Sequence, residues 1–483
     1  MDSIQLKQLL SKMTRDEKIG QMVQLAGEFY KKEDSENTGP MHEMNMTPEK
    51  MATIGSVLGV SGADTLITIQ KEHLAKSRLG IPLLFMADVI HGYRTIFPVP
   101  LGMASTWDPD LIEESATIAA KEAAVSGLHV TFSPMVDLVR DARWGRVMES
   151  TGEDPYLNQL YARAFVRGYQ GKDLAMDKLR VAACIKHFAG YGAPIAGREY
   201  NTVELSKRTL KEMYLPAYQA GIEEGSKLVM TSFNSLDGVP ATANKPLMRD
   251  VLRKELGFEG VLISDWASVG EMIPHGIAEN LKEAGGLAIT AGVDIEMMTG
   301  AYLNHLNELI DEGEIGEELI NEAVWRILTL KNDLGLFESP YRGANSAAEK
   351  TTVFSQEHRA KARGIAEESI VLLKNKDQTL PLNIHQKVAL IVPEGQAKDV
   401  LGAWSWKGQQ SESVSLYEGL LQHISKEAIV LKTIDCSIKE TPKDWLTDLN
   451  DVDVIIAAFG ESSYMSGEGA SRSNIKLPSE QIQ

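Results

Sequence analysis

The sequence has little of what several common classes of protein require. Its 483 residues include only two cysteines, Cys184 and Cys436, which excludes a disulfide framework and a multi-cysteine metal site. No stretch approaches the roughly 18 apolar residues of a membrane-spanning helix. Residues 1–20 carry scattered basic side chains and no continuous apolar core, unlike a signal peptide. We therefore expect a cytoplasmic protein with no membrane partner.

Basic residues are also in the minority. Lys and Arg total 49 against 67 Asp and Glu, so the formal net charge is −18. An acidic surface repels phosphate backbones and anionic lipids, and the sequence has no basic patch, so we expect no nucleic-acid partner. Hydrophobic residues make up 43% and charged residues 24%, which is ordinary globular composition and excludes disorder. At roughly 100–200 residues per domain, the length predicts two or three domains.

Short apolar runs alternate with longer helical patterns between residues 55 and 300. Strands separated by helices indicate parallel βαβ units, so we expect an α/β protein with a (β/α) TIM-like barrel. A doubly wound open sheet gives the same alternation and stays an alternative. The predicted strands are Gly55–Val60, Ile81–Asp88, Leu128–Pro134, Arg180–His187, Lys227–Asn234, Gly260–Asp265 and Ala288–Asp294. In a barrel, their ends would place polar residues around one mouth: Asp88, Lys186, His187, Asn234, Asp265 and Asp294.

The pattern changes after Tyr341. Residues 342–350 are small and polar, as in a linker, and residues 355–373 read as a helix followed by an apolar strand. Beyond them, a second alternation has strands predicted over Lys387–Val392 and Asp453–Ala458 and a helix near residues 416–425. This alternation indicates a second α/β domain.

We divide the chain into a barrel domain, residues 1–340, a linker, residues 341–385, and an α/β sandwich domain, residues 386–483. The last residues contain Pro478 followed by Glu480, which is typical of the first turn of a helix rather than the close of a fold. We therefore expect the sandwich domain to be truncated.

Motifs for phosphate or metal sites are lacking. Two glycine-rich strings, at residues 190–192 and 467–469, begin like a dinucleotide fingerprint, but Ile195 and Arg472 stand where the third glycine is required. The 10 histidines are dispersed, and no Walker loop, HExxH motif or zinc spacing occurs. We expect no cofactor and no metal.

Two strand ends carry residues suited to catalysis. Asp265 ends a largely apolar strand and is followed by Trp266. A carboxylate held on a strand beside an aromatic wall suits a nucleophile for glycosidic cleavage, which needs a second carboxyl group; a helix cap is the alternative. Lys186 and His187 end another strand. A Schiff base as in an aldolase, donors for sugar hydroxyls and a purely structural role all stay open for this pair.

Nine groups of short strings resemble the family-3 glycoside hydrolases, closest to the bacterial β-glucosidase branch. They span nearly the whole chain in the order of that family. They are ADVIHG (87–92), RDARWGR (140–146) with Glu149 and GEDPY (152–156), KHFAGYG (186–192), MTSFN (230–234), ISDW (263–266), LGLF (334–337), SIVLLKNKDQTLPL (369–382), GAWSW (402–406) and GEGASR (467–472).

The resemblance implies a (β/α) barrel followed by an α/β sandwich, with the active site between them. It places Asp265 at the nucleophile and Glu468 at the general acid/base of a retaining reaction. We expect a low pKa for Asp265, with basic neighbours keeping it ionised. The positions that match substrate-binding residues of the family are Asp88, Arg146, Lys186, His187, Arg198, Met230, Phe233, Trp266, Trp404 and Trp406.

The implied activity is exo-acting release of terminal non-reducing β-D-glucose from a β-glucoside or short β-glucan oligosaccharide. The N-acetylglucosaminidase branch has a His a few residues after the Lys-His pair, and residues 189–201 contain none. A β-xylosidase stays an alternative, because the two substrates differ by one hydroxymethyl group. A sugar-binding but weakly active fragment is a further alternative, and a homodimer is an open alternative for the assembly.

Overall fold

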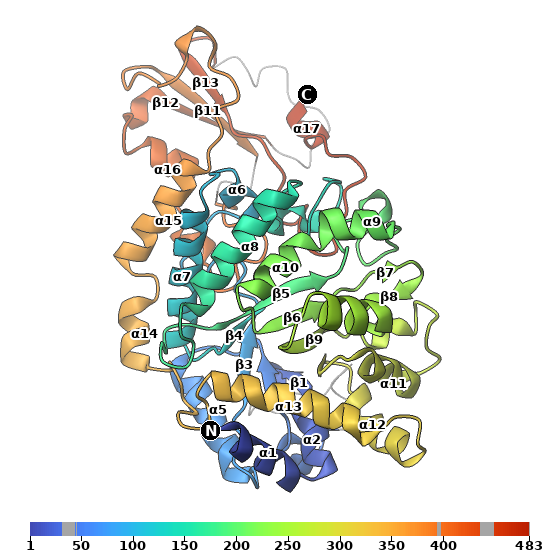
Figure 1. The fold of residues 1–483 in the computed structure, drawn as a ribbon. Coiled ribbons are helices and arrows are strands. Elements are labelled where there is room, and N and C mark those ends of the chain that lie inside the picture. Colours follow the sequence, from blue (N-terminus) through green and yellow to red (C-terminus); the bar gives the residue numbers. More distant parts are fainter. Residues whose placement is uncertain (31–43, 45, 394–397, 435–448, 483) are drawn as a thin grey trace.

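The computed structural model describes residues 1–30, 44, 46–393, 398–434 and 449–482. Eight parallel strands form a closed barrel in the order β1-β10-β9-β6-β5-β4-β3-β2 (Figure 1). The predicted barrel is confirmed, and the open sheet is wrong. The strands are β1 Val23–Ala26, β2 Ser56–Leu58, β3 Leu84–Ala87, β4 Val130–Thr131, β5 Ala182–Phe188, β6 Leu228–Thr231, β9 Val261–Trp266 and β10 Ile295–Met297.

In the barrel, one predicted strand is wrong, and two observed strands, β1 and β10, were not predicted. Residues 288–291 end the helix α11 (Leu281–Ala291), which stops at Gly292 in the left-handed region, with φ of 102°. The strand β10 starts only at Ile295, so Asp294 lies at its N-terminal end and not at the mouth. A short apolar run fits a buried helix end as well as a strand. The strand β1 was not predicted because it has only four residues, one of them Gln24.

Helices surround the barrel, and two of the longest begin with the same local signal. Asp108 and Asp154 accept backbone N–H bonds at the starts of α7 and α8, each followed by a proline at the first helical position. The helices of this part are α1 Ser3–Lys12, α2 Arg15–Gln21, α4 Pro48–Met51, α5 Ala63–Lys76, α6 Pro100–Ala104, α7 Pro109–Val125, α8 Pro155–Gln170, α9 Lys207–Thr209, α10 Pro216–Glu223, α11, α12 Ala301–Asp311 and α13 Glu317–Asp333, with π-helical turns at Leu210–Tyr214 and Pro246–Glu255. None of the described helices is long and apolar enough to cross a membrane.

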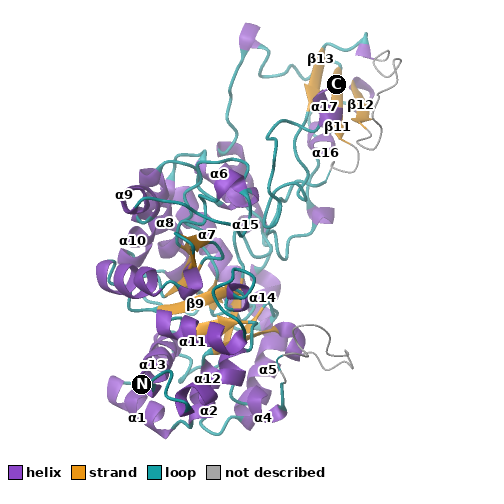
Figure 2. Ribbon diagram, turned by 90° about the vertical axis from the view of Figure 1, so that its right-hand side faces the viewer, coloured by secondary structure: helices purple, strands orange, loops and turns teal. Residues whose placement is uncertain are grey.

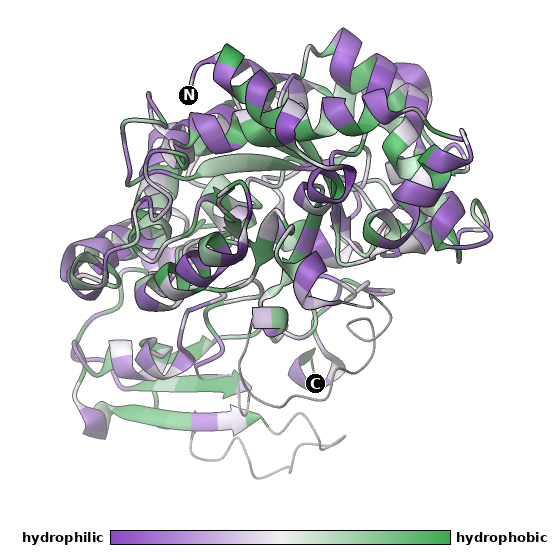
Figure 3. Cartoon of the chain, turned by 90° about the horizontal axis from the view of Figure 1, so that it is seen from below, coloured by the Kyte–Doolittle hydropathy of each residue, from purple (hydrophilic) through white to green (hydrophobic). Residues whose placement is uncertain are grey.

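The main hydrophobic core lies inside the barrel and between its strands and helices. Figure 3 shows apolar residues on the strands and a mixture of polar and apolar residues on the surrounding helices. Strand residues such as Leu84, Met86, Leu228 and Ile263 are fully buried. The buried strands form a rigid frame that fixes the side chains at their C-terminal ends.

A second, three-stranded parallel sheet lies beyond one end of the barrel (Figures 1 and 2). Its order is β12-β11-β13, and the central strand is buried. The strands predicted here, at residues 387–392 and 453–458, are confirmed, as is a helix starting at Leu416. The elements are β11 Val388–Pro393, β12 Ile429–Ile434, β13 Val454–Ala457, α16 Leu416–Leu420 and α17 Ser479–Ile482.

The apolar strand predicted within residues 355–373 is wrong. The helical part forms α15 (Gln356–Glu368), but residues 370–373 belong to no strand. Ile370 is 78% exposed and Leu373 is 92% exposed. Among the described residues, no strand pairs with this segment, although its side chains suit one. Cys184 is free and buried, whereas Cys436 lies outside the described residues.

A buried carboxylate anchors the segment between the two sheets to the barrel. The helices α14 (Ser346–Thr352) and α15 run along the barrel toward the second sheet (Figure 1). Glu122 of α7 accepts hydrogen bonds from the backbone N–H and hydroxyl of Thr95, at 3.0 and 2.7 Å. It also accepts one from the Phe354 N–H at 2.9 Å and lies 2.7 Å from His358 Nδ1. These contacts fix the segment that leads into the second domain against α7 of the barrel.

Candidate active site

A cavity of about 330 Å³ opens where the barrel strands end. Such a volume lies at the lower end of the range for small-molecule sites. The cavity brings together most of the residues expected at the site, and they come from both the barrel domain and the second α/β domain. Those lining it are Asp88, Arg146, Lys186, Met230, Phe233, Asp265, Trp266, Trp404 and Glu468, with Leu58, Phe132, Tyr200, Glu271 and Met297, which were not predicted.

Asp265 is presented by the last residues of β9. Its Oδ1 accepts the Trp266 backbone N–H at 2.6 Å, while its buried Oδ2 accepts no hydrogen bond from the described residues and lies 3.5 Å from His187 Nε2. Burial raises the pKa of Asp265 well above its usual value, and the charge of Glu468 raises it further, against the opposing effects of Arg146 and Lys186. The expected low pKa is therefore wrong in direction, because burial outweighs the cations.

The neighbouring side chains of Lys186 and His187 in β5 make different contacts. Lys186 Nζ donates to Asp88 Oδ1 at 2.9 Å. Burial alone would lower the pKa of Lys186, but the negative charges of Asp88 and Glu149 outweigh it and raise that pKa. A Schiff-base lysine needs the opposite shift, so the geometry argues against the aldolase alternative.

The His187 ring is held by Asp137, which lies 2.8 Å from its Nδ1. Burial lowers the pKa of His187 well below its usual value, and the charges of Arg146 and Lys186 lower it further. Burial also raises the pKa of Asp137 to about 7. His187 is therefore a neutral ring whose Nε2 faces Asp265 from behind the cavity wall.

Arg146 connects the barrel to the loop of residues 467–472, the acid-bearing loop, which carries Glu468. Its Nε and Nη2 donate to the two oxygens of Glu149, at 2.7 and 3.0 Å, and both side chains are buried. Its Nη1 lies 3.7 Å from Glu468 Oε1. The indole of Trp404 lies 5.7 Å from the Arg146 guanidinium and 5.4 Å from Lys186 Nζ, so it covers both cations.

Backbone contacts dock the loop 467–472 on the barrel. The Gly467 N–H donates to the Gly145 carbonyl at 2.7 Å, and the Arg472 N–H donates to the Arg143 carbonyl at 2.8 Å. The Glu199 N–H donates to Ser471 Oγ at 2.9 Å. These bonds bring Glu468 to the same cavity as Asp265, although 203 positions (468 − 265) separate them in the sequence.

Three expected site residues lie outside the cavity lining. His187 is behind it, as described. Arg198 is exposed, and its Nε donates to the nearby Ile195 carbonyl, at 3.3 Å. Trp406 packs edge-on against Tyr93, with ring centroids 5.5 Å apart. The substrate contacts assigned to these three residues stay predictions.

Two polar residues of the lining were missed. Glu271 lies in the short turn Gly270–Met272 after β9, and burial, together with the charge of Glu468, raises its pKa to about 7. Tyr200 lies in the loop after β5. Glu271 falls within a few residues of Asp265, and Tyr200 within a few residues of Arg198, and that proximity was the only signal available.

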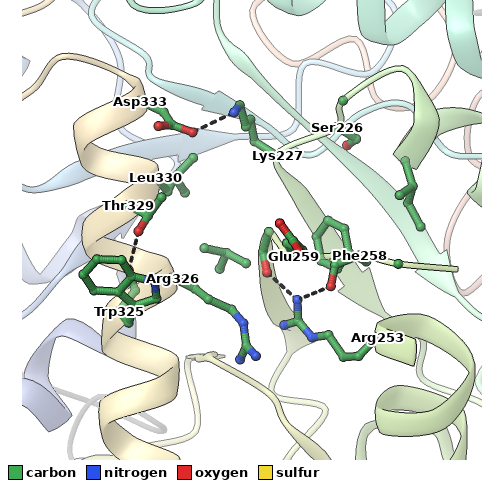
Figure 4. A pocket seen from close by; sticks show the side chains of 15 residues that line it. Ser226, Lys227, Arg253, Phe258, Glu259, Trp325, Arg326, Thr329, Leu330 and Asp333 are labelled. Atoms are coloured by element: carbon green, nitrogen blue, oxygen red, sulfur yellow. Dashed lines mark hydrogen bonds and ion pairs between the residues drawn. The ribbon is translucent and has the colours of Figure 1, made fainter. Parts of the chain in front are cut away.

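A larger cavity, of about 670 Å³, lies at the opposite, N-terminal ends of β6 and β9 (Figure 4). Lys227 pairs with Asp333 across this cavity at 2.6 Å, and Arg253 donates to two main-chain carbonyls and to Asp294, so these three lining residues already have partners. We place the chemistry in the smaller cavity, because it lies at the C-terminal ends of the barrel strands and is lined by Asp265 and Glu271, two carboxyl groups with raised pKa values.

The described residues hold no group of three or more His, Cys, Asp or Glu side chains that could bind a metal ion.

Comparisons with known proteins agree over both parts of the chain. Residues 14–330 match the family model "Glycosyl hydrolase family 3 N terminal domain", and residues 370–483 match "Glycosyl hydrolase family 3 C-terminal domain". A periplasmic beta-glucosidase of Salmonella typhimurium is 37% identical over 98% of this chain, and a beta-xylosidase of Formosa agariphila is 33% identical over 89% of it. The chain spans 64% and 63% of the lengths of these two relatives.

Solved structures agree more closely still. A beta-glucosidase from Listeria innocua in complex with glucose matches with a TM-score of 0.95 at 47% identity, covering 100% of this chain and 67% of that one. A mutant of the Listeria enzyme in complex with laminaribiose matches with a TM-score of 0.96 over the same shares.

Proposed function

This chain belongs to glycosyl hydrolase family 3, and from that premise we propose that it is a retaining, exo-acting β-glucosidase. The observation that carries the proposal is the meeting of Asp265 and Glu468, from two domains, in one cavity beside Arg146 and Lys186. Cleavage of a glycosidic bond needs one carboxyl group to protonate the leaving oxygen and another to meet the anomeric carbon. Of the carboxyl groups that line this cavity, Asp265 and Glu468 supply those two roles.

In the first step, one oxygen of the Asp265 carboxylate attacks the anomeric carbon. A bond forms between this oxygen and the carbon, the bond from the carbon to the leaving oxygen breaks, and the Glu468 proton passes to that oxygen. Asp265 must be ionised for this step. Arg146 and Lys186 act against the raised pKa of Asp265, and they stabilise the ionised form.

In the second step, water releases the sugar. Glu468 takes a proton from a water molecule, the water oxygen bonds to the anomeric carbon from the face that the leaving group left, and the bond to Asp265 breaks. Two inversions at one carbon give net retention. Glu468 ends the cycle protonated again, as the first step requires.

The proposed substrate is the non-reducing terminal glucose of a β-glucoside. Asp88 can accept bonds from sugar hydroxyls, while Lys186 and Arg146 can donate to them. Trp266 is 44% exposed at the cavity and offers an apolar face to a sugar ring. The Listeria structure with laminaribiose supports a gluco-disaccharide as the natural type of substrate. A β-xylosidase is the second candidate, favoured by the Formosa relative.

The test is the release of nitrophenol from nitrophenyl β-glucoside, β-xyloside and N-acetyl-β-glucosaminide, with Asp265→Ala as the control variant. Faster cleavage of the glucoside, lost in the variant and yielding the β-anomer first by NMR, supports the proposal. Faster cleavage of the xyloside would favour the second candidate. No cleavage by a folded chain whose melting temperature rises with glucose would instead favour a sugar-binding protein.

Two further proposals concern the setting of the enzyme. A cytoplasmic location rests on the chain's cysteine usage, which requires no oxidising compartment; the Salmonella relative is named periplasmic, and cell fractionation distinguishes the two. A homodimer is also proposed as the assembly to test, and light scattering on the purified chain measures its mass.

A further inference from the structure

One side-chain hydrogen bond crosses from the barrel to the carboxyl group of the acid-bearing loop. Tyr200, in the loop after β5, donates its phenol hydroxyl to Glu468 Oε1 at 2.8 Å. The bond joins residues 268 positions apart in the sequence. The hydrogen bonds of the Gly467 and Arg472 backbones and of Ser471 fix the path of the loop. Besides Tyr200, Arg146 approaches the Glu468 carboxyl group, at 3.7 Å.

The Tyr200 ring is itself held in place. It packs edge-on against Phe233, with centroids 5.0 Å apart and an interplanar angle of 84°. Its backbone has φ of 60°, a conformation that is costly for a residue with a bulky side chain. Such strain persists where the surrounding structure enforces it, and it is concentrated at functional sites. The phenol is therefore presented to the cavity in a defined direction.

The contacts of Glu468 distinguish its two oxygens. Tyr200 donates to Oε1, and the Arg146 Nη1 lies 3.7 Å from the same atom, too far for a direct hydrogen bond. No hydrogen bond from the described part of the chain reaches Oε2. Engaging Oε1 in this way leaves Oε2 to carry the proton that passes to the leaving oxygen.

The same bond suits both protonation states of the carboxyl group. When Glu468 is ionised, Oε1 accepts as a carboxylate oxygen; when Oε2 is protonated, Oε1 accepts as a carbonyl oxygen. Burial and the charge of Glu468 raise the pKa of Tyr200, so the phenol stays a donor at any pH at which the protein works. The orientation of Glu468 can thus be kept through the whole catalytic cycle.

We propose that Tyr200 is a positioning residue for the general acid/base Glu468, which it holds with Oε2 facing the glycosidic oxygen. The inference rests on the proposed function. Tyr200 acts through Glu468 and not on the sugar. Its hydroxyl should therefore affect the rate of cleavage only when the leaving group needs a proton. A sugar leaving group must be protonated as it departs, whereas dinitrophenolate leaves as a stable anion without a proton.

The experiment compares Tyr200→Phe with the wild type on laminaribiose and on dinitrophenyl β-glucoside. The variant keeps the ring that packs on Phe233 and removes only the hydroxyl. We expect kcat/KM for laminaribiose to fall about tenfold or more, a part of the roughly 10²–10⁴-fold that general acid–base catalysis supplies. We expect kcat/KM for dinitrophenyl β-glucoside to stay unchanged, since that constant reports the first bond-breaking step. Tyr341→Phe, at a half-exposed tyrosine after α13, is the matched control.

A double-mutant cycle with Glu468→Gln tests the route of the effect. If Tyr200 acts through Glu468, adding Tyr200→Phe to the Gln variant costs no further activity on laminaribiose. The inference is overturned if Tyr200→Phe lowers activity on laminaribiose as much in the Glu468→Gln variant as in the wild type. It is also overturned if Tyr200→Phe alone lowers kcat/KM equally for both substrates, or for neither. A wild-type chain that cleaves neither substrate overturns the proposed function and this inference with it. An active wild type with an unaffected Tyr200→Phe variant overturns the inference alone.

Discussion

Substituting one glycine of the barrel domain should move the acid away from the nucleophile while neither of these two residues is itself substituted. Gly145 lies where the loop 467–472 docks, and a Cβ built on it would lie 2.3 Å from the Gly467 carbonyl oxygen and 2.6 Å from the Ala470 carbonyl oxygen. Both neighbours are backbone atoms and cannot rotate away as the end of a side chain would. Gly145→Ala must therefore displace the loop that carries Glu468.

The size of the displacement follows from these distances. Restoring an ordinary contact of 3.4 Å from 2.3 Å requires about 1.1 Å of movement (3.4 − 2.3). A misplacement of about 1 Å can cost a catalytic step roughly 10²-fold, which is about 2.7 kcal/mol of transition-state stabilisation. We expect kcat/KM for laminaribiose to fall by about that factor, and kcat/KM for dinitrophenyl β-glucoside to fall much less, because Asp265 does not move.

The control for this variant is Gly364→Ala. Gly364 lies inside α15, where an added Cβ meets nothing within 4 Å, so alanine should be neutral or slightly stabilising. Thermal melting checks that both variants are folded. Wild-type activity of Gly145→Ala on laminaribiose would refute the reasoning, because it would mean that the position of the docked loop does not govern acid catalysis.

Two further predictions follow from buried carboxyl groups. Because the pKa of Asp265 is raised and only the ionised form attacks, kcat/KM should fall as the pH drops through a value well above 3.8, the usual pKa of an aspartate; a pH profile still flat at pH 4 would contradict this. Glu122→Ala should destabilise the protein by about 3 kcal/mol, measured by denaturant unfolding, because it leaves His358 and the N–H groups of Thr95 and Phe354 buried without their acceptor. A surface variant, Glu368→Ala, is the control for the second prediction, and equal stability of the two variants would contradict it.

Local patterns predicted most of the barrel and the strand-borne part of the site. Apolar runs such as Val261–Ile263 read as strands because a parallel barrel strand is buried on both faces, and Asp265 stands out as the charged residue that follows such a run. The prediction of a strand at residues 288–294 was wrong because a buried helix end and a strand can have the same composition. The prediction of a strand at the apolar residues 370–373 was wrong because a strand needs a partner, and none of the described strands pairs with this segment.

The sequence alone determined the fold class, the presence of two α/β units and the chemical types of the candidate site residues, because these depend on periodicity and on residues adjacent in the chain. Only the tertiary structure decided how those residues meet. The bond from Tyr200 to Glu468 depends on the docking of two loops from different domains, which leaves no periodic trace in the sequence. The direction of the Asp265 pKa shift was decided in the same way, since burial and the distances to Arg146, Lys186 and Glu468 exist only in the folded chain.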